Sequence, residues 1–150
     1  MRLKDILTQF DGITGEYRIC RIAVERLYLQ FQQDPTSFPR SQIHVPELPR
    51  TLRRLENTFL VHIFALFEAA LRELWANAFH KTTDPPVSVL IDAVGAARKF
   101  LPSNFIDPVH HVRELRNAIV HLHLPAPPPY TFVKAAHDLR AYLSLMPRQW

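Results

Sequence analysis

The chain has 150 residues, of which 47% are hydrophobic and only 3 are glycine. This length and composition indicate one globular domain with a sizeable core, spanning residues 1–150, and exclude a disordered chain. The single cysteine, Cys20, excludes an internal disulfide. The formal net charge of +4 is compatible with nucleic-acid binding but does not establish it.

Apolar residues recur mostly at helical spacing, and the 13 prolines fall mainly between these segments. This pattern predicts an all-α fold, a bundle of about five helices. The N-terminus is amphipathic and does not resemble a leader, and the most apolar run, residues 58–71, is too short to span a bilayer. We therefore expect a cytoplasmic protein without membrane contact.

The first helix is predicted over residues 3–33, and Asp34-Pro35 ends it. Its apolar residues are spaced alternately three and four apart, which predicts a narrow seam of coiled-coil type. Gly12 and Gly15 weaken the N-terminal half, so we expect a break near them. The seam consists of Phe10, Ile13, Tyr17, Cys20, Val24, Leu27 and Phe31.

A proline-rich linker over residues 34–49 precedes the second helix, which is predicted over residues 50–80. Its middle, residues 59–71, is apolar almost all round, which is typical of a helix covered on several sides. In so small a protein we expect a second copy of the chain to supply part of this cover. His62 is expected to be a core or interface histidine with a hydrogen-bond partner, and Trp75 a core residue.

The third helix is predicted over residues 87–100, and a break follows at residues 101–103. Asp107-Pro108 offers an N-cap followed by proline at the first helical position, so the fourth helix is predicted over residues 108–124. Prolines end it, and a fifth helix is predicted over residues 131–145.

The fourth helix contains the run Arg113-Glu-Leu-Arg-Asn-Ala-Ile-Val-His121. An arginine, an amide and a histidine that titrates near neutrality suit RNA cleavage without a metal. At about 100° per residue, its polar residues form a stripe, with Arg116 on the flank. The alternative is a solvated helix face on which Glu114 pairs with a neighbour. The stripe consists of His110, Arg113, Glu114, Asn117 and His121.

Arg116-Asn117-Ala-Ile-Val-His121 follows a long helix that contains Phe-Glu-Ala-Ala-Leu-Arg-Glu-Leu-Trp. In these features residues 50–145 resemble the HEPN superfamily (higher eukaryotes and prokaryotes nucleotide-binding domains), whose members carry Arg-x4-6-His with a polar residue after the arginine. Within it they look like the stand-alone RiboL-PSP or MAE-type nucleases. The resemblance implies a HEPN-like helical bundle that cleaves RNA without metal or cofactor. It also implies a homodimer with both motifs in one cleft, acting as a toxin or abortive-infection effector.

The resemblance also implies a role for each motif residue. His121 acts as general base on a ribose 2′-OH, or as general acid toward the leaving 5′-oxygen. Arg116 binds the scissile phosphate and stabilises its developing charge, and Asn117 orients the phosphate or the imidazole. A second His121 across the two-fold axis supplies the opposite proton transfer. The expected products are a 2′,3′-cyclic phosphate and a 5′-hydroxyl.

Some HEPN toxins continue the motif as Arg-x4-His-x-Tyr, and an antitoxin adenylylates the tyrosine. Here His123 stands at the tyrosine position. This departure argues against control by tyrosine modification and leaves a different antitoxin protein, or none, open.

Other side chains are weaker candidates. Glu68 and Arg72 are either groups supporting the motif helix or an internal ion pair, and the ion pair is favoured. Arg113 is a further supporting cation. The arginines at the start of the second helix are either RNA-phosphate contacts or a solvated helix end. Trp75 and Trp150 could stack on bases. The arginines are Arg50, Arg53 and Arg54.

Two rival interpretations remain. A metal site is the natural rival in a histidine-rich bundle, but the Glu-x-x-His repeats and cysteine pairs of such sites are missing, so no metal ligand is predicted. A non-catalytic HEPN module that binds RNA, a nucleotide or a protein partner is the other. The residues that suggest a metal are His110, His111, Glu114, His121 and His123.

Overall fold

The computed structural model describes residues 2–36, 47–97, 102–121, 124, 128 and 130–148. These residues form five α-helices and no strand, which confirms the predicted all-α bundle. The helices are α1 (Leu3–Gln33), α2 (Leu48–Ala78), α3 (Val87–Ala97), α4 (Ser103–Val120) and α5 (Phe132–Ser144).

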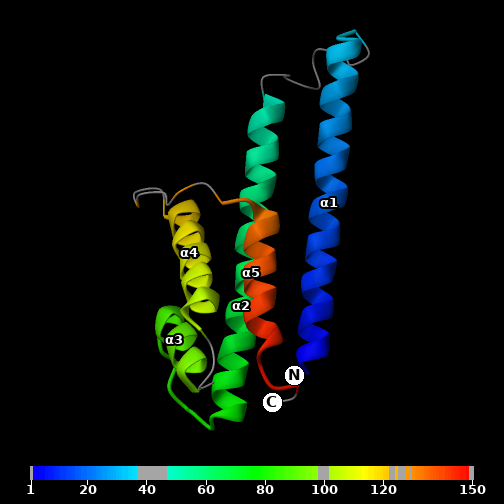
Figure 1. Ribbon diagram of the computed structural model, residues 1–150. Coiled ribbons are helices and arrows are strands. Elements are labelled where there is room, and N and C mark those ends of the chain that lie inside the picture. Colours follow the sequence, from blue (N-terminus) through cyan, green and yellow to red (C-terminus); the bar gives the residue numbers. More distant parts are fainter. Residues whose placement is uncertain are drawn as a thin grey trace.

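Helix α2 is the centre of the bundle. It contacts each of the other four helices, with α1 antiparallel along its length, α4 and α5 beside its middle and lower part, and α3 near its lower end (Figure 1). Its fully buried side chains recur at helical spacing and are all apolar, so they supply the middle of the core. They are Leu60, Ile63, Phe64, Phe67, Ala70, Leu71 and Leu74.

Helix α1 has the bounds that its sequence predicts. It runs without interruption through Gly12 and Gly15, so the predicted break is wrong. Packing against α2 and α5 supports this half of the helix and outweighs the low helix propensity of glycine. The first three seam residues, Phe10, Ile13 and Tyr17, are buried.

The remaining seam residues, Cys20 to Phe31, are only half-buried. Figure 1 shows the reason: the upper parts of α1 and α2 extend beyond α4 and α5 as a two-helix projection. We call residues 18–33 of α1 and 48–55 of α2 the arm. Because two helices alone cannot enclose a seam, the apolar residues of the arm keep part of their surface in solvent.

Helix α5 is joined to α1 and α2 at its first turn. Thr131 is the N-cap and accepts a hydrogen bond from the Lys134 N–H, while the Glu56 carboxylate accepts one from the Phe132 N–H at 2.8 Å. A carboxylate is favourable at the positive end of a helix. The Phe132 ring packs 4.3 Å from that of Tyr17, and 6.0 Å from that of Phe59.

The short helix α3 lies close against α4. A Cβ atom added at Gly95 would stand 2.8 Å from the Ile106 side chain, so the absence of a side chain permits this approach. The buried Tyr142 hydroxyl of α5 donates a hydrogen bond to the Ile91 carbonyl of α3 at 2.7 Å. Burial raises the pKa of Tyr142 well above its usual value, which keeps the hydroxyl protonated as a donor.

The boundaries of α4 differ from the prediction. The helix begins at Ser103 after an extended Pro102, and Pro108 lies inside it, so Asp107 is not an N-cap. Pro108 is the sixth residue of the helix, beyond the four whose N–H groups have no partner, so it removes one intrahelical bond, the one to the Asn104 carbonyl. The helix also ends at Val120, before the predicted Leu124.

The other helices differ from their predicted bounds by a few residues, and residues 98–100 of the third prediction lie outside the described part. The first and last parts of the described chain meet at one end of the bundle, where the Leu3 N–H donates to the Arg148 carbonyl at 3.1 Å (Figure 1). None of the described helices has an apolar stretch that could cross a bilayer.

The Tyr142 hydrogen bond gives a test of the α3–α5 contact. Tyr142→Phe should lower the free energy of unfolding by about 1 kcal/mol, because it removes the hydroxyl donor from a buried carbonyl while retaining the ring. Urea denaturation followed by circular dichroism measures the change. Tyr28→Phe, on the arm, is the control. Equal stabilities of the two variants would show that the bond contributes nothing.

Candidate functional site

Helix α4 turns its apolar side toward the core and carries the motif on its last two turns. Val109 and Val112 are fully buried. Arg116 follows them at the same helical spacing, so its side chain points toward α2 instead of remaining on the solvated flank. The guanidinium carbon lies 5.8 Å from the centre of the Phe64 ring of α2. This distance permits a cation–π contact.

Arg116 and Asn117 are hydrogen-bonded to each other. The Arg116 Nη1 donates to the Asn117 Oδ1 at 3.0 Å. The Arg116 Nε is buried and has no hydrogen-bond partner among the described residues. A buried donor without an acceptor is unfavourable, so this guanidinium has spare capacity for an anion.

Arg113, one turn earlier on α4, is in a similar state. Its side chain is 23% exposed and contacts the Glu114 carboxylate at 3.4 Å, which is a long ion pair. The Arg113 Nε is also buried without a partner in the described part of the chain. Arg113 and Arg116 are three residues apart on α4, and each has an Nε donor without an acceptor among the described residues. An oxyanion is the kind of ligand that arginine donors bind.

The sequence predicts His121 inside the fourth helix. In the structure, His121 is instead the C-cap of α4. Its backbone N–H donates to the Asn117 carbonyl at 2.8 Å, and its own carbonyl accepts from the Leu124 N–H at 2.9 Å. The residue is exposed. Asn117 thus bonds to Arg116 through its side chain and to His121 through its backbone. The side-chain contact joins Arg116 to Asn117, and the backbone bond places His121 one turn further along, at the end of α4.

The other histidines of α4 point to different neighbours. His110 Nε2 lies 2.7 Å from Asp92 of α3. The His111 ring packs against Tyr130 in a tilted arrangement with the centroids 4.6 Å apart, and its Nε2 is buried without a partner among the described residues. No three His, Cys, Asp or Glu side chains of the described chain are grouped as metal ligands would be. His123 lies outside the described residues.

A polar cluster that the sequence did not suggest lies beside His111. Tyr130 and Lys134 both bond to the Asp138 Oδ2, and His137 Nδ1 lies 3.1 Å from the Asp138 Oδ1. Burial alone would raise the pKa of Asp138, but the hydrogen bonds from Tyr130, His137 and Lys134 outweigh it and hold the pKa below its usual value. The i to i+4 pair of Lys134 and Asp138 was the only local signal for this cluster.

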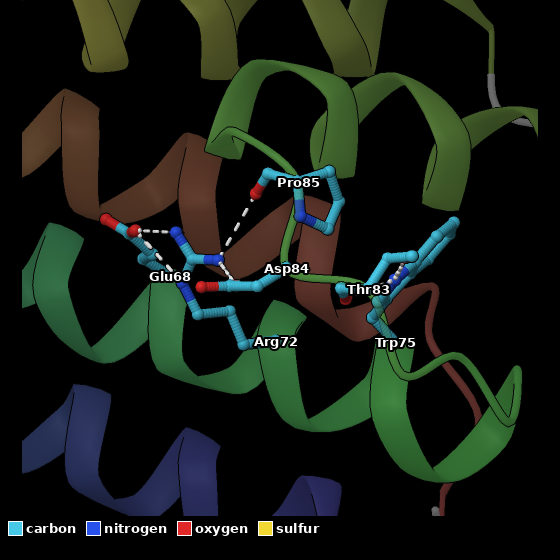
Figure 2. A network of polar contacts seen from close by, with 6 residues as sticks. All are labelled: Glu68, Arg72, Trp75, Thr83, Asp84 and Pro85. Carbon is cyan, nitrogen blue, oxygen red and sulfur yellow. Dashed lines mark hydrogen bonds and ion pairs between the residues drawn. The ribbon is translucent and has the colours of Figure 1, made fainter.

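Glu68 and Arg72 form the ion pair that the sequence analysis favours. The Arg72 Nη2 lies 2.6 Å from the Glu68 Oε1, and Nη1 contacts both the Asp84 carboxylate and the Pro85 carbonyl at the start of α3 (Figure 2). The Trp75 Nε1 donates to the Thr83 carbonyl at 3.1 Å. These contacts attach the loop between α2 and α3 to α2. All of these contacts join α2 to itself or to this loop, and none of them joins Glu68 to the motif on α4.

The remaining candidates lie apart from the motif. The arginines at the start of α2 are exposed on the arm, and Arg54 lies about 15 Å along the helix axis from Phe64. His62 is exposed, so it is not a core residue, and its place at an interface stays a prediction. Trp75 packs at the edge of the core, as predicted. Trp150 lies outside the described residues. The exposed arginines are Arg50, Arg53 and Arg54.

Comparison of the chain with models of known protein families, with curated proteins and with solved structures finds no match. The resemblance to HEPN proteins therefore depends on the residues quoted above.

The Asp138 cluster predicts a pH dependence of stability. Because the pKa of Asp138 is lowered on folding, its carboxylate stabilises the fold above pH about 4 and loses this effect as the pH falls through the lowered value. Asp138→Asn should therefore lower the Tm at pH 7. The difference from the wild type should shrink below pH about 4. Thermal unfolding at several pH values measures it, and a difference that is constant with pH would contradict the assignment.

Proposed function

We propose that the protein is a metal-independent endoribonuclease of HEPN type, with the motif at the end of α4 as its active site. The observation that carries the proposal is the pair of partly buried arginines, Arg113 and Arg116, whose Nε donors have no partner among the described residues. They adjoin Asn117 and the exposed His121. Unsatisfied arginine donors beside a histidine suit a phosphodiester that is to be cleaved by proton transfer.

In the proposed mechanism the two arginines bind the scissile phosphate, and Arg116 stabilises the charge that develops on it. Asn117 holds Arg116 in place through the 3.0 Å hydrogen bond. One His121 accepts the proton of the ribose 2′-OH, whose oxygen attacks phosphorus. The bond to the 5′-oxygen breaks as a second histidine donates a proton to it. The products are a 2′,3′-cyclic phosphate and a 5′-hydroxyl.

A second copy of the chain supplies the second histidine in this proposal. Val120 and Leu124 flank His121 and are 46% and 40% exposed, and Val133 on the first turn of α5 is 55% exposed. Apolar surface at the motif favours a protein contact there. A two-fold contact over these residues would bring two His121 side chains into one cleft.

The biological setting is proposed from the resemblance alone. We propose a toxin or abortive-infection effector that cleaves cellular or phage RNA in the cytoplasm, held in check by an antitoxin protein or by none. The exposed arginines at the start of α2 would contact RNA phosphates distant from the cleaved bond. They are Arg50, Arg53 and Arg54.

A second function is supported by one observation. In a single copy the motif offers anion-binding donors, but His121 is the only histidine at the last turn of α4 in the described part of the chain. This arrangement suits binding of a phosphate without cleavage. The alternative is therefore a non-catalytic module that binds RNA, a nucleotide or a protein partner.

His121→Ala should decrease RNA cleavage about 10²- to 10⁴-fold while leaving the protein folded, because it removes the group that transfers protons. Arg116→Ala should weaken RNA binding as well. His137→Ala removes an exposed histidine from α5 and is the matched control. Cleavage of a fluorescent RNA in excess EDTA measures activity, and growth after induced expression measures toxicity.

The outcomes separate the alternatives. Cleavage that persists in EDTA and disappears in His121→Ala supports the enzyme. RNA binding without cleavage, equal in the wild type and His121→Ala, would establish the binding module instead. Activity that EDTA abolishes and Zn²⁺ or Mn²⁺ restores would contradict the metal-independent mechanism.

A further inference from the structure

Helix α1 carries a second row of residues spaced three and four apart, on the side opposite to its seam with α2. We call this row the outer stripe. Its three large aliphatic residues are exposed although they lie in the middle of a long helix: Ile19 is 69% exposed, Ile22 42% and Leu29 55%. Aliphatic residues in a 3-4 row on one helix form the seam of a helix pair. The outer stripe consists of Gly12, Gly15, Ile19, Ile22, Arg26 and Leu29.

The two glycines of the outer stripe have no role inside the described chain. A Cβ atom added at Gly12 or Gly15 would meet nothing within 4 Å. Glycine within a helix weakens it relative to alanine, so both positions lose stability without any contact that requires the space. A helix from outside the chain that lies close to the backbone of α1 would explain why glycine stands at these two positions.

We infer that the outer stripe packs against the outer stripe of a second copy of this chain, with the two α1 helices antiparallel. In the register that fits best, Ile19 lies beside Ile22 of the second copy. Gly12 then faces Leu29 of the second copy, and Gly15 faces the Arg26 side chain. The two isoleucines thus meet at the centre of the contact, and toward each end a glycine stands opposite a large side chain, which is the shape complementarity that a helix pair needs.

Charge complementarity identifies the occupant as a second copy. Arg18 is exposed and Glu25 is partly exposed, and both lie on the same flank of the outer stripe, one heptad apart. Within its own helix Glu25 also pairs with Arg21 at 2.8 Å, so it would be shared between Arg21 and the Arg18 of the second copy. In the antiparallel pair, Arg18 of each copy lies opposite Glu25 of the other, which gives two ion pairs related by the two-fold axis. A parallel pair would instead place Arg18 opposite Ala23, and Asp11 opposite Glu16. The antiparallel arrangement is therefore favoured.

This contact is separate from the one in the proposed function. Helices α2 and α5 lie between α1 and α4, so a pair formed through α1 does not bring two His121 residues together (Figure 1). A protein that used both surfaces would assemble beyond the dimer. The α1 contact is consequently testable whether or not the chain cleaves RNA.

Sedimentation equilibrium on the full chain tests the contact. The wild type should self-associate, and Ile22→Asp should weaken the association about 100-fold or more, because it places two carboxylates in an apolar seam. Val89→Asp, on α3, is the matched control since Val89 is 48% exposed. Gly12→Leu should also weaken association while it raises the Tm of the monomer, a combination that misfolding cannot produce.

A charge swap tests the register. Arg18→Glu and Glu25→Arg should each weaken association about tenfold, and the double variant should restore it. A monomeric wild type would overturn the inference, as would Ile22→Asp with unchanged association. Failure of the double variant to recover would overturn the antiparallel register. Association lost in Val133→Asp but kept in Ile22→Asp would assign the contact to the motif surface instead.

Discussion

Burial of apolar side chains on several sides of α2 is the constraint from which the rest of the fold follows. One side receives α1, a second receives α5, and a third receives α3 and α4. Phe64 shows how far this reaches toward the motif, because its buried ring supports the Arg116 guanidinium. A cation held on an apolar surface has few protein acceptors near it. Arg116 therefore has a donor without an acceptor because its guanidinium lies against the apolar core.

The elements of this fold were largely predictable from the sequence, and their ends were not. Apolar spacing located all five helices, and the end of α1 was predictable because Asp34-Pro35 follows its last residue. Helix α4 was misplaced because Pro108 was interpreted as a start signal. Proline is favoured at the first helical position, but Pro108 lies in the second turn of α4, where it removes one backbone bond, so it does not mark the first residue of this helix.

The candidate site was predicted less well, because its geometry depends on contacts far apart in sequence. Spacing placed Arg116 on a solvated flank, whereas packing of α4 on α2 turns it inward. The Glu68–Arg72 pair follows from an i to i+4 spacing, but the contact with Asp84 depends on the course of a loop. The Glu56 cap of α5 joins residues 76 positions apart, and no local signal could have indicated it.

The meeting of the chain ends has a consequence for engineering. The Leu3 N–H and the Arg148 carbonyl are already within hydrogen-bonding distance, so a short linker would close the backbone into a ring with little distortion of the native state. A ring has fewer unfolded conformations than an open chain, and its folding therefore costs less entropy. Cyclisation would stabilise the bundle from the end opposite to its two-helix projection, leaving the surfaces of α1 and α4 accessible.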